Sequence, residues 1–338
     1  MTSETQLVAI NTVRGNADPS SLGAVLMHEH LFVITAELPR PLAHFEPEKA
    51  VTDAVTQLSR LKACGIDTLV DLTVPGLGRR IDLMSKVAAM SPVQLIAATG
   101  WYTYSELPPY FQLRTPRNGD PERDVLTDLF VRELTVGIDG TDIRAAVIKC
   151  VTDRPGMTPD VRRILRAAAA AHRRTGATIM THADSGTRRG LEQVELLADE
   201  GVDLTRVVIG HCGDSTDMAY LEALIEKSVL LGMDRFGLSH LLDTQQRLRT
   251  VALLVAEGAR DQLVLSHDAA VSIDWVDLDQ RERHFNEWRF DYLPTQGLPA
   301  LRSLGVSEED LTVMLRQTPR RLLTWPSPID HPAHPSNR

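Results

Sequence analysis

The sequence is poor in cysteine, and it has no excess of positive charge. Its 338 residues include three cysteines, Cys64, Cys150 and Cys212. This odd number, spread along the chain, argues against a disulfide framework and favours reduced thiols. Acidic residues outnumber basic ones by 45 to 36, and the pI is near 5.7. This balance argues against a nucleic-acid partner and gives no support for binding to anionic membranes.

Long apolar runs are also missing. No stretch approaches the roughly 18 apolar residues that a transmembrane helix needs. The first ten residues, MTSETQLVAI, lack the basic start and the apolar centre of a secretory signal. We therefore expect a cytoplasmic protein without a membrane partner. Hydrophobic residues at 43% and charged residues at 24% are ordinary for a folded enzyme or binding protein with a large core.

What the chain does have is a regular alternation of short apolar runs and longer helical patterns. The apolar runs are nearly continuous and rich in Val, Ile and Leu, which is typical of strands covered on both faces of a parallel sheet. Eight such strands are predicted, over residues 24–33, 67–73, 93–100, 145–151, 177–183, 206–212, 228–234 and 262–269.

Helical spacing fills the segments between these strands. The clearest case is 158–176, where Thr158 is the expected N-cap, Pro159 takes the first helical position and Gly176 follows a basic last turn. Further helices are predicted over 47–65, 186–201, 215–227, 296–304 and 307–323.

Eight strands that alternate with helices predict an α/β protein with a (β/α)8 fold, the TIM barrel. We expect residues 1–325 to form a single barrel domain with a short N-terminal extension at 1–22. The proline-rich segment 326–338 is expected to be a flexible tail.

Metal-ligand side chains end five of the predicted strands, at the rim where such a barrel carries its active site. The first strand contains His28-Glu29-His30, and side chains two residues apart on a strand point to the same face, so both histidines can reach one ion. Imidazole and carboxylate ligands without aligned thiols suit Zn²⁺, Co²⁺, Mn²⁺ or Fe²⁺. The other four strands contribute Lys149, His182, His211 and Asp268.

Each of these residues also has an ordinary structural explanation. His28 and His30 can form a polar core pair, and His211 can be a hydrogen-bonded core histidine. Asp268 can cap a following helix. Lys149 can pair with Asp268. Alternatively, because burial and nearby cations lower the pKa of an amine, Lys149 can react in its neutral form with CO₂ and give a carbamate that bridges two ions. The occurrence of the whole set at one rim favours the metal site.

Short segments of the chain resemble the phosphotriesterase family of the amidohydrolase superfamily, and they occur in the order of that family. They span residues from about 11 to 323, include every predicted strand and look most like the phosphotriesterase-like lactonases. The segments are LMHEH, DLTVPGLGR, ATGWYTY, VIKC, THADSG, IGHCGDSTD, GMDRFG and LSHDA.

The resemblance implies a binuclear metal centre with zinc as the first choice. It implies that His28, His30 and Asp268 hold the buried ion. His182 and His211 would hold the exposed one. A carboxylated Lys149 and a hydroxide would bridge the two ions, and the carboxylate of Asp268 would accept the proton of this hydroxide as it attacks the substrate. Relatives of this kind also lead us to expect a homodimer.

The resemblance also implies roles for residues around the metals. Tyr102, in GWYTY, would meet the ester oxygen or the leaving group, with Tyr104 beside it in the substrate site; for Tyr102 the alternative is an aromatic residue that only packs. Arg235, in DRFG, would serve catalysis and substrate binding and anchor the loop after the seventh strand. Trp275 is expected to line the substrate channel.

The substrate loop is predicted over residues 270–293. In a chain with only 5% aromatic residues, this loop contains Trp275, Phe285, Trp288, Phe290 and Tyr292. Such an aromatic mouth suits an acyl chain, while packing of a helix on the barrel is the alternative for most of these side chains.

We therefore expect hydrolysis of lactones, N-acyl-homoserine lactones in particular, with phosphotriester hydrolysis as a side reaction. The tetrahedral adduct of a lactone resembles a phosphotriester in shape and charge, which explains why one site takes both. The alternatives are a dedicated phosphotriesterase (an aryldialkylphosphatase) and a non-catalytic barrel that binds a metal or ligand. In the first two cases the partner is a small-molecule lactone or organophosphate.

Two departures from the family pattern lie near the mouth. Ala183-Asp184 stands where many relatives have a threonine–histidine pair, and His240 stands where an apolar residue is more usual. The preference for one acyl chain over another therefore stays open.

Overall fold

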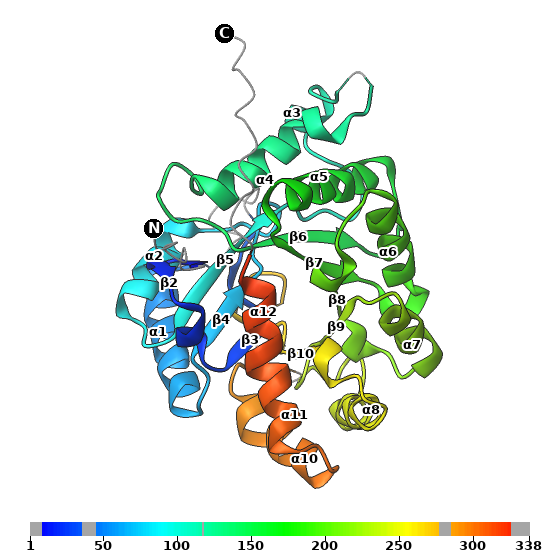
Figure 1. Ribbon diagram of the computed structural model, residues 1–338. Coiled ribbons are helices and arrows are strands. Elements are labelled where there is room, and N and C mark those ends of the chain that lie inside the picture. Colours follow the sequence, from blue (N-terminus) through cyan, green and yellow to red (C-terminus); the bar gives the residue numbers. More distant parts are fainter. Residues whose placement is uncertain (1–8, 36–44, 117, 277–284, 326–338) are drawn as a thin grey trace, which may run out of the picture.

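A parallel β-barrel forms the centre of the computed structural model, which describes residues 9–35, 45–116, 118–276 and 285–325 (Figure 1). All eight predicted strands are present close to their predicted bounds, and neighbours in the chain pair in parallel register. They are β3 (Val25–Val33), β4 (Thr68–Asp71), β5 (Gln94–Gly100), β6 (Val147–Thr152), β7 (Thr178–Ala183), β8 (Val207–Gly210), β9 (Leu230–Met233) and β10 (Leu263–Leu265).

The barrel closes through a strand that the sequence pattern did not reveal. After β10 has paired with β9, the chain continues into β11 (Ala270–Ile273), which pairs in parallel with β3. Between these two strands, the backbone N–H groups of His267 and Ala269 donate to the buried carboxylate of Glu29 on β3, at 2.8 and 2.9 Å. The prediction of a (β/α)8 barrel is confirmed.

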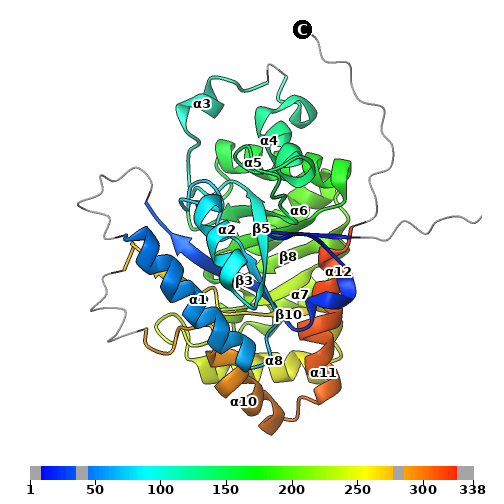
Figure 2. The same ribbon diagram turned by 90° about the vertical axis from the view of Figure 1, so that its left-hand side faces the viewer.

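Helices surround the barrel on its outer side (Figures 1 and 2). The predicted helix at 158–176 is α5, and its signals act as expected: the Thr158 side chain accepts from the Val161 N–H, and Gly176 ends the helix with φ of 74°. The outer helices are α1 (Pro47–Ala63), α2 (Ile81–Met90), α3 (Pro109–Gln112), α4 (Val125–Thr135), α5 (Pro159–Thr175), α6 (Arg189–Asp199), α7 (Met218–Glu226) and α8 (Thr244–Ala256).

The two predicted C-terminal helices are present: the first packs on α8, and the second covers the N-terminal end of the barrel. They comprise α10 (Leu298–Ser303), α11 (Glu308–Thr312) and α12 (Thr318–Leu323), with π-helical segments at Leu293–Gly297 and Val313–Gln317. Figure 1 shows α12 lying across that opening. Leu322 and Leu323 of α12 join the buried cluster inside the barrel, so this end is plugged and the opposite end is left for the site.

The structure describes only part of the segments predicted at the two ends of the chain. Within the expected extension 1–22, residues 10–17 form a hairpin of β1 (Ile10–Thr12) and β2 (Gly15–Ala17), and residues 1–8 lie outside the described residues. The expected tail 326–338 also lies outside them, as do residues 277–284 of the substrate loop. No helix in the described part of the chain has the length and hydropathy to span a membrane.

Candidate metal centre and substrate pocket

A bulge in β3 aims the two histidines of the HxH motif into the barrel. Val25 and Met27 belong to the buried cluster inside the barrel, so plain alternation would send Glu29 inward and the histidines outward. The register on β4 advances by two residues while β3 advances by three, between Leu26 and Glu29. This extra residue reverses the alternation, so that His28 and His30 face the interior instead.

Three of the predicted ligands converge at one point. Oδ1 of Asp268 lies 3.3 Å from Nε2 of His28 and 3.1 Å from Nε2 of His30. One ligand atom from each of these residues lies within 4.8 Å of the others. Such a set of two imidazoles and a carboxylate fits one divalent ion.

Two further predicted ligands meet beside this group. Nε2 of His211 lies 2.9 Å from Nδ1 of His182, and the rings of His211 and His28 stack with centroids 5.1 Å apart. Burial lowers the pKa of all three imidazoles, most strongly that of His211, where Arg235 adds to the effect. Neutral rings are the form that binds metals.

Lys149 lies beside His28, whose ring stacks on that of His211. Its side chain is buried, and its Nζ lies 3.0 Å from Nε2 of His28. Burial lowers the pKa of this amine to about 8. The alternative of a direct pair with Asp268 is not what the described residues show, because no ion pair between these two side chains lies within 4 Å.

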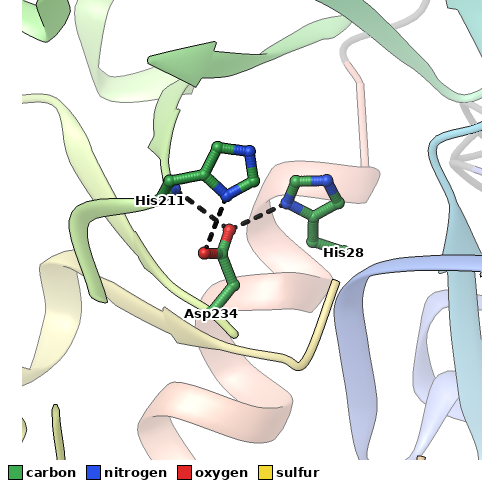
Figure 3. Close-up of side chains that lie close together, drawn as sticks. All are labelled: His28, His211 and Asp234. Atoms are coloured by element: carbon green, nitrogen blue, oxygen red, sulfur yellow. Dashed lines mark hydrogen bonds and ion pairs between the residues drawn. The ribbon is translucent and has the colours of Figure 1, made fainter. Parts of the chain in front are cut away.

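Asp234, which the sequence analysis missed, orients two of the ligands. It follows β9, is almost fully buried, and its carboxylate accepts from Nδ1 of His28 at 2.8 Å and from Nδ1 of His211 at 3.0 Å (Figure 3). Burial alone raises the pKa of this carboxyl, but His211 and His28 reverse the effect and hold it well below its usual range. Because Asp234 uses the Nδ1 atoms, it leaves Nε2 of both rings for a metal.

The remaining histidines are oriented in the same way. Asp153 accepts from Nε2 of His182, which leaves Nδ1 of that ring facing His211. Thr73 bonds Nδ1 of His30 at 2.9 Å and leaves its Nε2 facing Asp268. Each of the four imidazoles therefore has one nitrogen held by the protein and one directed into the site.

A chain of ion pairs positions the carboxylate of Asp268. Nε of Arg235 donates to Asp268 at 3.0 Å, and its Nη1 donates to Asp214 at 2.6 Å. Asp214 also accepts from the fully buried Arg247 at 2.6 Å. Burial alone raises the pKa of Asp268, but His28, His211, His30 and Arg235 together hold it well below its usual range.

Arg235 does not simply anchor the loop after the seventh strand, because its side chain contacts Asp268 and Asp214. Asp214 and Arg247 were not among the predicted site residues. Asp214 lies in the segment IGHCGDSTD, three residues after His211, and that short spacing was the available signal. Arg247 gave no signal in the sequence.

Above the ligands, a cavity of about 270 Å³ opens to the surface. Tyr102, Tyr104 and Trp275 line it, as does every predicted metal ligand. The hydroxyls of Tyr102 and Tyr104 are hydrogen-bonded at 2.8 Å, and the Tyr102 ring lies 6.1 Å from that of Trp275. The site residues predicted from the sequence are thus brought together around one cavity.

The aromatic residues of the substrate loop divide between the cavity and the core. Trp275 is 49% exposed and lines the cavity with Phe285. Phe290 and Tyr292 are buried in the core around the barrel, so the packing alternative holds for these two side chains. Trp288 does both, because it lines the cavity and its Nε1 donates to the His267 carbonyl at 2.8 Å.

Of the two departures from the family pattern, His240 lies at the cavity, whereas Asp184 bonds within a turn. His240 lines the cavity, in the loop between β9 and α8. Asp184 accepts a hydrogen bond from Thr187 at 2.8 Å in the turn after β7.

Comparisons with known proteins agree with this architecture. A family model described as the phosphotriesterase family matches residues 8–323. A phosphotriesterase homology protein of Mycobacterium tuberculosis is 46% identical over 315 residues, which cover 93% of this chain and 97% of that one. An aryldialkylphosphatase of Saccharolobus solfataricus is 32% identical over 92% of this chain and 98% of its own.

A solved structure gives the same result. The structure titled as the phosphotriesterase from Mycobacterium tuberculosis superposes with a TM-score of 0.90 at 44% identity, and the match covers 95% of this chain and all of that one. The barrel, the ligand set at its C-terminal rim and these matches over nearly the full length lead to one conclusion. The chain belongs to the phosphotriesterase family of metal-dependent hydrolases.

Proposed function

We propose that this protein hydrolyses lactones, with N-acyl-homoserine lactones as the preferred class and phosphotriesters as slower substrates. The observation that carries this proposal is the composition of the single cavity above the ligands. Its floor carries the histidines, Lys149 and Asp268, while its mouth is lined by apolar side chains such as Leu238, Ile273 and Trp275. A polar floor suits the reacting carbonyl, and an apolar mouth suits an attached acyl chain.

We propose that two divalent ions, zinc in the first instance, occupy the floor. His28, His30 and Asp268 would hold one of them, and His182 and His211 the other. When bound, such a pair of ions lowers the pKa of water and polarises a carbonyl or phosphoryl oxygen. The convergence of these Nε2 and Nδ1 atoms on two neighbouring points supports this assignment.

We propose that Lys149 carries a carboxyl group on Nζ. Its neutral amine attacks CO₂, a nitrogen–carbon bond forms, and one proton leaves to solvent, giving a carbamate with two oxygens. The position of Nζ 3.0 Å from Nε2 of His28 supports this assignment, since a carbamate there would help to hold the ions.

The other residues serve proton transfer and orientation. The carboxylate of Asp268 accepts the proton of the attacking water, and Arg235 holds that carboxylate ionised and in place. Burial keeps the pKa of Tyr102 well above its usual value, so its hydroxyl remains a hydrogen-bond donor for the ester oxygen or leaving group. Trp275 and Tyr104 contact the rest of the substrate at the mouth.

A dedicated phosphotriesterase is the second candidate, and the names of the relatives favour it. The solved neighbour is titled a phosphotriesterase, and the relative from Saccharolobus solfataricus is named an aryldialkylphosphatase. The two candidates share the same metal ligands but predict opposite orders of kcat/KM for lactones and phosphotriesters.

Parallel kinetics decide between them. We expect kcat/KM to be highest for long-chain N-acyl-homoserine lactones, lower for aliphatic δ-lactones and lowest for a phosphotriester. Asp268→Asn protein prepared in the same way controls for contaminating hydrolases. A phosphotriester with the highest kcat/KM would overturn the lactonase proposal in favour of the second candidate.

Metal analysis tests the third alternative, a barrel that binds a metal or ligand without catalysis. We expect close to two ions per chain after growth in medium supplemented with zinc, and loss of hydrolysis on treatment with a chelator. Fewer than about one ion per chain would overturn the binuclear centre, and no turnover of any ester would support the non-catalytic barrel instead.

A further inference from the structure

The mouth of the cavity is mostly apolar on the side formed by the loops after β9 and β11. Leu238, Leu241 and Ile273 contribute aliphatic surface, and Trp275 and Phe285 contribute rings. His240 lies among them, in the loop between β9 and α8, and its side chain is exposed. Apart from the site residues already described, it is the one titratable side chain among the described residues that line this cavity.

The His240 ring has no hydrogen-bond partner in the described part of the chain, although it is held by a ring contact. It meets Phe285 edge to face, with centroids 5.8 Å apart and planes at 83°. This contact uses the carbon skeleton of both rings and leaves the imidazole nitrogens available. A polar group whose bonding capacity is unused, within an apolar wall, is the arrangement by which pockets recognise one polar atom of a ligand.

The backbone around His240 is anchored on both sides. The Gly237 N–H donates to Oγ1 of Thr244 at 3.2 Å, and the Ser239 hydroxyl bonds the same atom at 3.1 Å. Beyond His240, the buried Arg247 donates to the Leu242 carbonyl. A polar contact from a fixed loop costs less ordering on binding than one from a free loop.

Gly237 lets this loop approach the segment that carries Phe285 and Trp288 on the other side of the mouth. Gly237 has φ of 85°, and a Cβ atom there would lie 2.1 Å from the Glu287 carbonyl oxygen. No other residue fits such an approach, so the β9–α8 loop lies directly on the segment that carries Phe285 and Trp288. The position of His240 relative to the mouth is thereby fixed from two directions.

We propose that His240 selects lactones whose acyl chain carries an oxo or hydroxyl group, by a hydrogen bond from or to its imidazole. An oxo group would accept from a ring N–H, and a hydroxyl group can bond either nitrogen. An unsubstituted chain offers the imidazole no partner, so this hydrogen bond does not form. This inference rests on the proposed lactonase function and names the substrate class within it.

The test compares N-acyl-homoserine lactones of one chain length with an unsubstituted, a 3-oxo or a 3-hydroxy acyl group. In the wild-type protein, we expect kcat/KM to favour the substituted chains. His240→Leu should reduce that preference by about 2- to 12-fold, the range of one hydrogen bond, mainly through KM. His240→Asn, which keeps a donor and an acceptor, should retain part of it.

Leu241→Ala is the matched control on the same wall. It removes apolar contact without touching the polar group, so it should lower kcat/KM for all three lactones alike. Equal preference in the wild type and in His240→Leu, with lactones still hydrolysed, would overturn this inference alone. Absence of turnover for every lactone in the wild type, with phosphotriester hydrolysis intact, would overturn the proposed function itself.

Discussion

The two ends of the barrel use the same left-handed backbone conformation but fill it with different residues. At the N-terminal end, helices that lead into strands finish with glycines at positive φ: Gly65, Gly176, Gly201 and Gly258. At the C-terminal end, glycines such as Gly237 share this conformation with four other residues, Arg188, His211, Arg235 and Asp268, whose φ values are 55°, 62°, 65° and 53°. Glycine adopts this conformation freely, whereas other residues lose about 1–2 kcal/mol.

This difference shows where the fold accepts strain. Three of these four residues, His211, Arg235 and Asp268, line the cavity, and their conformation turns His211 and Asp268 toward the other predicted ligands. Strain of this kind persists only where surrounding contacts hold it, and here Asp234 and Arg235 supply them. Among the described segments that lead from a helix into a strand there are two exceptions, Asp139 with φ of 49° before β6 and Ser228 with φ of 66° before β9. The comparison predicts that changes at one end affect activity and that changes at the other affect stability.

The largest effect is expected at Asp268. Asparagine tolerates a positive φ and has the same shape, so Asp268→Asn should fold normally and still bind metal. Without a carboxylate it cannot accept a proton, and kcat should fall by about 10²- to 10⁴-fold. The measurements are kcat, metal content and Tm of the same preparation. Turnover near that of the wild type would remove Asp268 from proton transfer.

A smaller loss of activity is expected at Asp234, which contacts two of the predicted ligands and not the substrate. In Asp234→Asn the amide can no longer accept from Nδ1 of both His28 and His211, so at least one ring loses its orientation. We expect metal affinity to fall by about 10- to 100-fold, measured by competition with a chromophoric chelator. Activity should recover at high metal concentration. An unchanged affinity would show that the rings are positioned without this carboxylate.

The contrast between Asp268 and Asp234 also shows what could be predicted from the sequence. Each predicted metal ligand is a residue of ligand type at the end of an apolar strand, and both features are local, so the barrel and the residues that meet around its cavity could be predicted. Asp234, Asp153 and Arg247 act through partners far away in the chain, and no local spacing announces such contacts. The bulge in β3 and the closing strand β11 depend on pairing with neighbouring strands, which periodicity does not report.

A substitution at the N-terminal end of the barrel should lower stability and leave activity unchanged. At Gly258, with φ of 89°, an added Cβ would meet no atom within 4 Å, so Gly258→Ala introduces backbone strain without a clash. We expect a loss of about 1–2 kcal/mol of stability, which lowers the urea midpoint, and an unchanged kcat/KM. A fall in kcat/KM at full metal occupancy would contradict the separation of the two ends.

The smallest expected effect is a pH dependence of stability that arises from His172, also at the N-terminal end of the barrel. His172, near the end of α5, donates from Nδ1 to the Ala177 carbonyl at 2.8 Å, and its Nε2 accepts from the Asp203 N–H at 3.2 Å. These bonds require the neutral ring, and burial lowers the pKa of His172. Arg206 and Arg173 lower it further, while Asp203 opposes them.

The sign of the effect follows from this lowered pKa. Above the unfolded pKa of about 6.5, neither state binds a proton at this ring and its contribution is complete; as the pH falls below that value, the unfolded chain takes up the proton first and stability is lost. His172→Asn keeps a donor toward Ala177 but does not titrate. It should therefore be less stable than the wild type at pH 8, and the gap should narrow toward pH 5. Urea unfolding of both proteins across this range measures the gap directly, because the titration of the metal-site histidines is common to both and cancels in the difference. A gap that stays constant or widens toward pH 5 would show that His172 does not lower stability by taking up a proton.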